Sequence, residues 1–142
     1  MEITIEDALP EDELQVITLW KACNLVASYN DPGADFRFAL DGATSCVLVA
    51  KDTAARIVGS VMVGHDGHRG WLYYLAATPD ARGRGIGKAM VEAGEQWLQR
   101  RGVPKVQLMI RPANTAVASF YEHLGYEDMP RVLMSKWLTQ PG

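Results

Sequence analysis

The sequence contains few cysteines and no long apolar run, and these two features exclude a disulfide-rich protein and a membrane-spanning helix. Cys23 and Cys46 are the only two cysteines among 142 residues, and they form no C-x-x-C pair and no cluster with histidine. This pattern predicts buried thiols rather than a disulfide framework, and no metal site is expected. The longest segments without an acidic or basic residue, 70–79 and 112–121, are ten residues long. A membrane-spanning helix needs about 18 such residues, so none is expected.

The chain also lacks a basic excess and a basic, apolar leader. Its formal net charge is −3 at pH 7, whereas nucleic-acid-binding domains usually carry an excess of lysine and arginine. We therefore expect no nucleic-acid partner. The first seven residues, Met-Glu-Ile-Thr-Ile-Glu-Asp, are acidic and do not resemble a signal peptide. The sequence thus predicts a cytoplasmic protein that has no membrane partner.

What is present is typical of an ordinary folded protein. Apolar residues make up 48% of the chain and charged residues 22%, and the length predicts a single domain over residues 1–142. The charge is unevenly distributed, because residues 1–50 carry a balance of −7 and the remainder carries +4. Solvated helix ends explain such a distribution. An anionic ligand on the C-terminal part, with a cationic ligand facing the N-terminal part, explains it as well.

The hydrophobic pattern of the N-terminal part predicts one strand followed by two helices. Ile3 and Ile5 alternate with polar residues, as in a short strand. The acidic residues 11–13 are typical of a helix start, because they lie at the positive end of the helix dipole. A turn at residues 30–33 separates this helix from a second one near residues 34–40.

The pattern then changes to strands. Three apolar runs separated by turn residues predict antiparallel strands at 46–50, 57–63 and 71–77. The remaining predicted elements are a helix from residue 86 that ends at Gly102, a strand at 106–110, a helix from Asn114 to Leu124 and a strand at 132–138. The order β-α-α-β-β-β-α-β-α-β describes an α/β fold with a mixed, mostly antiparallel sheet flanked by helices.

The segment Arg82-Gly83-Arg84-Gly85-Ile86-Gly87-Lys88, between a strand and a helix, is the most informative part of the sequence. Its three alternating glycines allow a ligand to approach the backbone, and the helix start has no Ser, Thr, Asp or Asn cap. These features predict a phosphate-binding turn. The dinucleotide fingerprint G-x-G-x-x-G does not fit, because its third glycine would fall at Lys88 or Met90. A P-loop does not fit either, because it requires a hydroxyl at Ala89.

With these residues the sequence resembles the GNAT superfamily of acetyl-coenzyme A (acetyl-CoA)-dependent N-acetyltransferases. The family pattern [Q/R]-x-x-G-x-[G/A] matches residues 82–87. A second pattern, N-x-x-A-x-x-[LF]-Y-x-x-x-G-[FY], matches Asn114, Phe120, Tyr121, Gly125 and Tyr126, with Val117 in place of the usual alanine. The two matches occur in the family's usual order and spacing. Residues 66–70 and 73–75 are further similar to the small bacterial YpeA subgroup.

The resemblance implies acetyl-CoA as co-substrate and a set of residues that bind it. Main-chain N–H groups from Gly83 to Ala89 would hold the pyrophosphate, and the main chain of residues 75–77 would pair with the pantetheine amides. In the family, the strands that here carry Leu75 and Leu108 diverge to admit the thioester. The complete implied set is Leu75, Ala76, Ala77, Arg82, Gly83, Arg84, Gly85, Ile86, Gly87, Lys88, Ala89, Asn114 and Phe120.

The resemblance also implies roles in the chemistry. Direct attack of an amine on a thioester needs a deprotonated amine, a polarised carbonyl and a proton for the departing thiolate. Tyr121 occupies the position that protonates the sulfur in the family, and packing beside Phe120 is the alternative role for this side chain. The N–H group of Ala76 or Ala77 would polarise the carbonyl oxygen.

No general base stands at the positions that the family uses. Met109 and Trp71 occupy the two places where relatives carry a glutamate, which leaves His65, Asp66, His68 or an ordered water.

The resemblance implies an amine acceptor, either a small molecule or a protein N-terminus, and a lysine or polyamine acceptor would need a base or an acidic pocket. At pH 7 roughly one α-amine in six is neutral, against roughly one lysine amine in 2,500. A protein or peptide α-amine is therefore slightly favoured. A coenzyme A-binding or sensing module without catalysis is the alternative function. Dimers are frequent in the family, which leaves a homodimer open.

Overall fold

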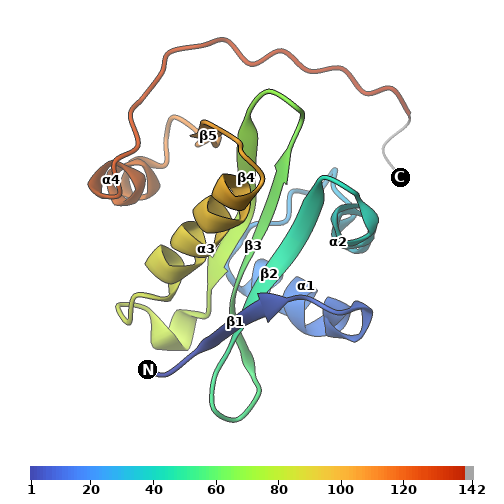
Figure 1. Cartoon of the computed structure of the whole chain (residues 1–142), viewed down its shortest axis with the longest axis vertical. Helices are drawn as coiled ribbons and strands as arrows, with labels where there is room; N and C mark the ends of the chain where they lie inside the picture. The colour runs from blue at the N-terminus through green and yellow to red at the C-terminus, as the bar shows by residue number, and fades with distance from the viewer. Residues whose placement is uncertain (140–142) are drawn as a thin grey trace. The chain divides into compact units, whose positions relative to one another are not determined.

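Five strands form one sheet in the spatial order β1-β2-β3-β4-β5 (Figure 1). They are β1 (Thr4–Asp7), β2 (Ser45–Lys51), β3 (Ile57–His65), β4 (Gly70–Ala77) and β5 (Val106–Gln107). The first four pair antiparallel, and β5 runs parallel to β4. This computed structural model describes residues 1–139 and divides into two units, Met1–Leu108 and Met109–Gly142. The whole sheet belongs to the first unit.

Two helices cover one face of this sheet and a third covers the other. The helices α1 (Glu13–Ala22), which follows the 3-10 turn η1 (Pro10–Asp12), and α2 (Pro32–Asp41) lie on one face, and α3 (Ile86–Arg100) lies on the opposite face (Figure 1). Neighbouring residues of β3 show the alternation that makes this possible. Ser60 contacts α1, whereas Gly59 lies so close to α3 that an added Cβ atom would be 2.6 Å from Ile86 Cγ2.

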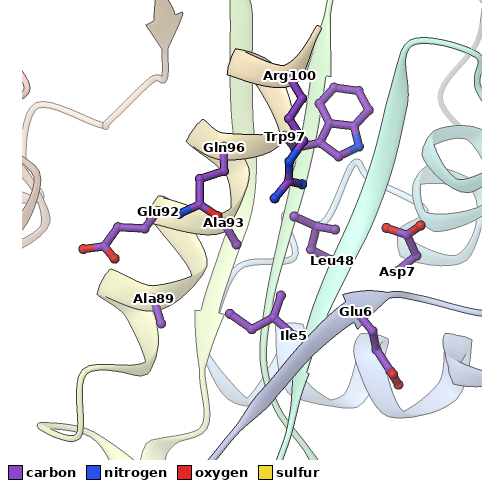
Figure 2. A pocket seen from close by; sticks show the side chains of 10 residues that line it. All are labelled: Ile5, Glu6, Asp7, Leu48, Ala89, Glu92, Ala93, Gln96, Trp97 and Arg100. Atoms are coloured by element: carbon purple, nitrogen blue, oxygen red, sulfur yellow. The ribbon is translucent and has the colours of Figure 1, made fainter.

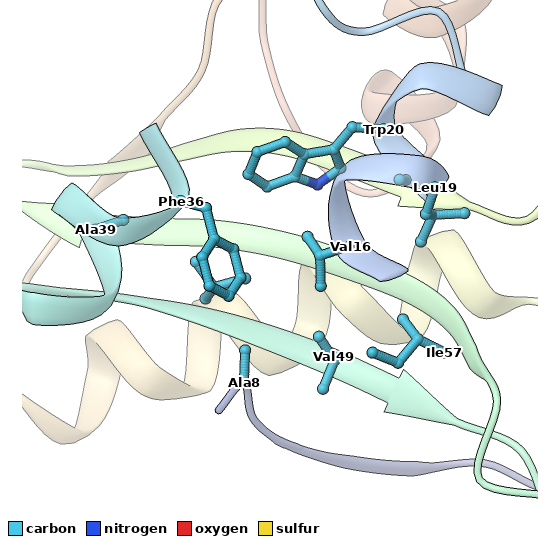
Figure 3. Packing of buried hydrophobic residues seen from close by; sticks show 10 residues of the cluster. Ala8, Val16, Leu19, Trp20, Phe36, Ala39, Val49 and Ile57 are labelled. Carbon is cyan, nitrogen blue, oxygen red and sulfur yellow. The ribbon is translucent and has the colours of Figure 1, made fainter. Parts of the chain in front are cut away.

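The larger part of the core lies between the sheet and the helices α1 and α2 (Figure 3). Trp20, Phe36 and Val16 are completely buried there, together with Val49 of β2. The turn predicted at residues 30–33 serves as the start of α2, because Asp31 Oδ1 accepts a hydrogen bond of 3.1 Å from the N–H of Ala34. The helices α1 and α2 thus pack against β2, β3 and β4.

The described part of the second unit, residues 109–139, contains one helix, α4 (Thr115–His123), which begins after Asn114 as predicted. The strand predicted at residues 132–138 is wrong, because the described residues 126–138 form neither helix nor strand. Val132, Met134 and Leu138 are 87%, 87% and 90% exposed. An apolar pattern alone does not form a strand, because a strand requires a hydrogen-bonding neighbour.

The other predicted helices and strands are confirmed, and one of the strands is shorter than expected. The strand predicted at 106–110 is only two residues long, because its ladder with β4 ends at Gln107. Cys23 and Cys46 are free thiols, as predicted, but they are half-buried rather than buried. Among residues 1–139, no helix is long and apolar enough to cross a membrane.

Candidate active site

A loop of glycine and arginine residues connects β4 to α3 through the 3-10 turn η2 (Pro79–Ala81). Gly83 and Gly85 have φ angles of +83° and +79°, in the left-handed region that glycine adopts without steric cost. Gly85 occupies the N-cap position of α3 and provides no side-chain hydrogen bond to the helix. The uncapped helix start predicted from the sequence is therefore confirmed.

The first turn of α3 presents backbone donors and no acidic side chain. The helical hydrogen-bond ladder begins with the N–H of Ala89, which donates to the carbonyl of Gly85 at 3.0 Å. The N–H groups of Ile86, Gly87 and Lys88 therefore precede the ladder, at the positive end of the helix dipole. Arg82 and Arg84 are exposed in the preceding loop. This arrangement is suited to a phosphate group.

A polar network attaches the start of the loop to the sheet. The Nη2 atom of Arg56 donates hydrogen bonds of 3.0 Å to Thr78 Oγ1 and to both carboxylate oxygens of Asp80. The N–H of Thr78 also donates to the carbonyl of Val58 at 2.8 Å. The hydrogen bond from Arg56 keeps the pKa of Asp80 below its usual range. This anchor could not be predicted from the sequence, since no local pattern links Arg56 to residues 78–80.

A bulge interrupts the pairing of β4 with β3. The register changes between the pairs Ser60↔Ala76 and Met62↔Tyr73, so Tyr74 and Leu75 together face Val61. Tyr74 has a φ angle of +51°. For a residue with a side chain, this left-handed conformation costs about 1–2 kcal/mol. Bulges of this kind redirect the backbone, and they are frequent next to active sites.

The opposite edge of β4 is largely open. The parallel ladder with β5 joins only Gly70 to Val106 and Trp71 to Gln107. Within residues 1–108, the β4 edge beyond Trp71 therefore has no neighbouring strand. This is the position at which the resemblance predicts that the two strands diverge. An open edge next to a bulge offers backbone groups to an extended ligand.

Asp66, one of the candidate bases, stabilises the turn between β3 and β4. The carboxylate of Asp66 accepts hydrogen bonds from the N–H groups of Arg69 (2.8 Å) and His68 (2.9 Å) and from Trp71 Nε1 (3.3 Å). These bonds lower the pKa of Asp66 to about 2. A carboxylate with so low a pKa is a weak proton acceptor at neutral pH. This geometry favours a role for Asp66 in stabilising the turn.

In the second unit, Tyr121 is 6% exposed and packs edge-to-face against two aromatic rings. The ring centroids of Phe120 and Tyr126 lie 5.0 and 5.4 Å from that of Tyr121. Burial raises the pKa of Tyr121 to about 12. Asn114 is exposed, and its side chain forms no capping hydrogen bond with α4. The role of proton donor that the resemblance assigns to Tyr121 stays a prediction.

One cavity of the first unit does not coincide with the predicted cofactor residues. It has a volume of about 370 Å³ and lies between β1 and α3, lined by Ile5, Leu48, Ala89, Glu92, Trp97 and Arg100, among others (Figure 2). Ala89 is the only lining residue that the predicted set contains. The predicted cofactor residues of this unit instead lie along the edge of β4, in the loop before α3 and in the first turn of α3. No group of three metal-binding side chains occurs among residues 1–139.

Comparison with known proteins identifies the family. The model of the acetyltransferase (GNAT) family matches residues 13–126. An acetyltransferase of Sodalis glossinidius is 47% identical over 124 residues, which cover 87% of each chain. An acetyltransferase of Pectobacterium atrosepticum is 44% identical over 141 residues, which cover 99% of this chain and 97% of the relative. The chain belongs to the GNAT acetyltransferase family.

Solved structures with low sequence identity share the fold. A structure of AAC(6')-Iy in complex with the bisubstrate analogue CoA-S-monomethyl-acetylneamine has a TM-score of 0.82 at 18% identity, covering 98% of this chain and 100% of that chain. A putative acetyltransferase from Agrobacterium tumefaciens has a TM-score of 0.78 at 20% identity, covering 94% and 99%. The α/β fold class predicted from the sequence is confirmed. The protein is an acetyltransferase of a family that uses acetyl-CoA.

The left-handed conformation of Gly85 leads to a prediction about stability. We expect Gly85→Ala to lower the free energy of unfolding by about 1–2 kcal/mol, because alanine is strained at a positive φ. No atom lies within 4 Å of the added Cβ position, so the cost is conformational. Gly87→Ala, inside α3, is the matched control and should be neutral or stabilising by up to about 1 kcal/mol. Urea denaturation measures both, and equal stability of the two variants would contradict the assigned loop geometry.

Proposed function

We propose that the enzyme transfers the acetyl group of acetyl-CoA directly to a primary amine. The observation that carries the proposal is that two backbone features follow one another in the chain. The open edge of β4 is suited to the amide groups of pantetheine, and the uncapped N-terminus of α3 is suited to the pyrophosphate. The neighbour AAC(6')-Iy was solved with a CoA-based analogue, which supports a CoA-type ligand on this fold.

The charge distribution supports the same placement. Residues 51–142 carry a balance of +4, and Arg82, Arg84 and Lys88 lie in or beside the loop before α3. An anionic cofactor is attracted to such a region. The acidic balance of residues 1–50 suits a cationic acceptor. The complete set proposed to bind the cofactor comprises residues 75–77 and 82–89, together with Asn114 and Phe120.

In the proposed reaction, the nitrogen of a neutral amine attacks the thioester carbon. The N–H group of Ala76 or Ala77 stabilises the negative charge that develops on the carbonyl oxygen. The carbon–sulfur bond then breaks, and Tyr121 donates its phenolic proton to the departing sulfur. The proton lost by the amine passes to water or to a base and restores the phenol. Because the pKa of Tyr121 is raised to about 12, this side chain is protonated at neutral pH.

The proposed acceptor is a protein or peptide α-amine. A substantial share of α-amines, roughly one in six, is already neutral at pH 7. Such an acceptor can lose its proton through an ordered water, so a strong general base is not required. His65 and His68 remain candidate bases beside the water. The similarity to the YpeA subgroup stays a prediction.

A second candidate function is coenzyme A binding without catalysis. It is favoured by one feature of the sequence, which is that Met109 and Trp71 stand at the two positions where the family resemblance places a glutamate. Such a module would bind acetyl-CoA as tightly as an enzyme does. It would release no free thiol with any amine.

Calorimetric titration with acetyl-CoA tests the cofactor site. We expect a dissociation constant near 1 μM, which corresponds to about −8.2 kcal/mol. Dephospho-CoA lacks the 3′-phosphate, so weaker binding than that of acetyl-CoA would show that this phosphate is recognised. A titration with ATP tests whether a nucleotide without the pantetheine arm is sufficient for binding. No binding of acetyl-CoA at millimolar concentration would contradict both candidate functions.

Tyr121→Phe tests the proton donor. We expect kcat to fall by about a hundredfold or more, as for the loss of a general acid, with unchanged affinity for acetyl-CoA. Thiol release with a panel of α-amino peptides measures kcat. Tyr126→Phe is the matched control, since it removes a hydroxyl from the ring in contact with Tyr121. If turnover persists in Tyr121→Phe, its side chain only contributes to packing.

A further inference from the structure

Two residues from the helices on one face of the sheet hold the bulged residue of β4. The ring of Tyr74 stacks on Trp20 of α1, with ring centroids 4.0 Å apart and an interplanar angle of 8°. Its hydroxyl donates a hydrogen bond of 2.7 Å to Oδ2 of Asp35 in α2. The side chain of Tyr74 is therefore held by α1 at its ring and by α2 at its hydroxyl.

The remainder of the bulged segment is attached to α1 as well. Trp20 is completely buried, and its Nε1 atom donates to Oγ of Ser60 at 3.0 Å. Ser60 pairs with Ala76 in the ladder next to the bulge. The thiol of Cys23, which follows α1, donates to the carbonyl of Ala77 at 3.2 Å. Residues 74–77 are thus held at both ends by side chains of the same helical layer.

These contacts explain how a tyrosine keeps a conformation that side chains disfavour. A left-handed backbone at a bulky residue persists only where its surroundings impose it. Burial, together with the neighbouring Asp35 carboxylate, raises the pKa of Tyr74 above its usual range. The hydroxyl therefore stays protonated and remains a donor. Asp35 is half-buried on the surface of α2, so the hydrogen bond, rather than apolar packing, is its contribution to the bulge.

We propose that Trp20 and Asp35 are positioning residues for acetyl transfer, because they hold Tyr74 in its left-handed conformation and thereby aim the N–H group of Ala77, which faces the open edge of β4, at the thioester carbonyl. This inference rests on the proposed function. It assigns α1 and α2 a role in catalysis in addition to covering the sheet. They determine the geometry of the segment that polarises the carbonyl, so a change in either helix alters catalysis without touching the cofactor.

Four variants separate this positioning role from general packing. Tyr74→Phe keeps the stacked ring and removes the hydroxyl, and Asp35→Ala removes the acceptor. Asp35→Asn conserves an acceptor oxygen and should restore the wild-type behaviour. Arg37→Ala is the matched control, because it removes an exposed ion pair of 2.7 Å between α2 and Glu13 of α1 without touching the bulge. Thermal melting verifies that each variant is folded.

The main readout requires no acceptor. Acetyl-CoA and S-ethyl-CoA differ in the carbonyl oxygen, so the ratio of their dissociation constants reports the contact between that oxygen and the bulge. We expect the wild type to prefer acetyl-CoA by about fivefold to tenfold, as for one hydrogen bond. In Asp35→Ala and Tyr74→Phe the ratio should approach one, with unchanged affinity for S-ethyl-CoA. Asp35→Asn and Arg37→Ala should keep the wild-type ratio.

Turnover provides the second readout. We expect kcat to fall by about tenfold in Asp35→Ala and in Tyr74→Phe, because the backbone donor is misdirected. The KM for acetyl-CoA should rise by no more than the roughly fivefold to tenfold loss of affinity expected in the titration. The double variant should be no slower than either single variant, since both break the same hydrogen bond.

The outcomes distinguish this inference from the function on which it rests. If the wild type prefers acetyl-CoA and the variants keep that preference, the positioning role is wrong and the proposed function stands. If the wild type binds both ligands equally, the bulge does not contact the carbonyl and the inference fails. If the wild type binds neither ligand, the proposed function fails, and the inference fails with it.

Discussion

The bulge in β4 is the feature on which the proposed active site depends. A regular strand would direct the backbone groups of residues 74–77 alternately to its two neighbours. The extra residue opposite Val61 and the left-handed backbone of Tyr74 break this regularity. Because the ladder with β5 ends at Gln107, the bulged segment also borders an open edge. An extended ligand can therefore reach backbone groups that a complete sheet would occupy.

The loop after β4 adds an electrostatic component to this edge. Left-handed glycines at 83 and 85 turn the chain into α3, and the helix start carries no acidic residue. The hydrogen bonds of Arg56 with Thr78 and Asp80 attach the beginning of this loop to the sheet. The binding groups proposed for pantetheine and for the pyrophosphate thus follow one another along a continuous, anchored segment. Preorganisation of this kind reduces the entropy lost on binding.

Much of this fold and of the proposed cofactor site could be predicted from the sequence, because the signals are local. Alternating glycines and the missing helix cap identified the loop before α3, and apolar runs identified β2, β3 and β4. The bulge could not be predicted, since tyrosine ordinarily favours regular strands. Its conformation depends on Trp20 and Asp35, which are far from Tyr74 in the chain. The strand predicted at 132–138 failed for a related reason, because pairing is a property of the neighbour and is not encoded in the apolar pattern.

Mapping the backbone amides by NMR during an acetyl-CoA titration shows whether the open edge of β4 and the start of α3 bind the cofactor. We expect the largest chemical-shift changes at residues 75–77 and 83–89, where these two features would contact the cofactor. The amides of Ile5 and Leu48, which line the cavity beside β1, should change little. Changes confined to that cavity, with residues 75–77 unaffected, would contradict this placement of the cofactor.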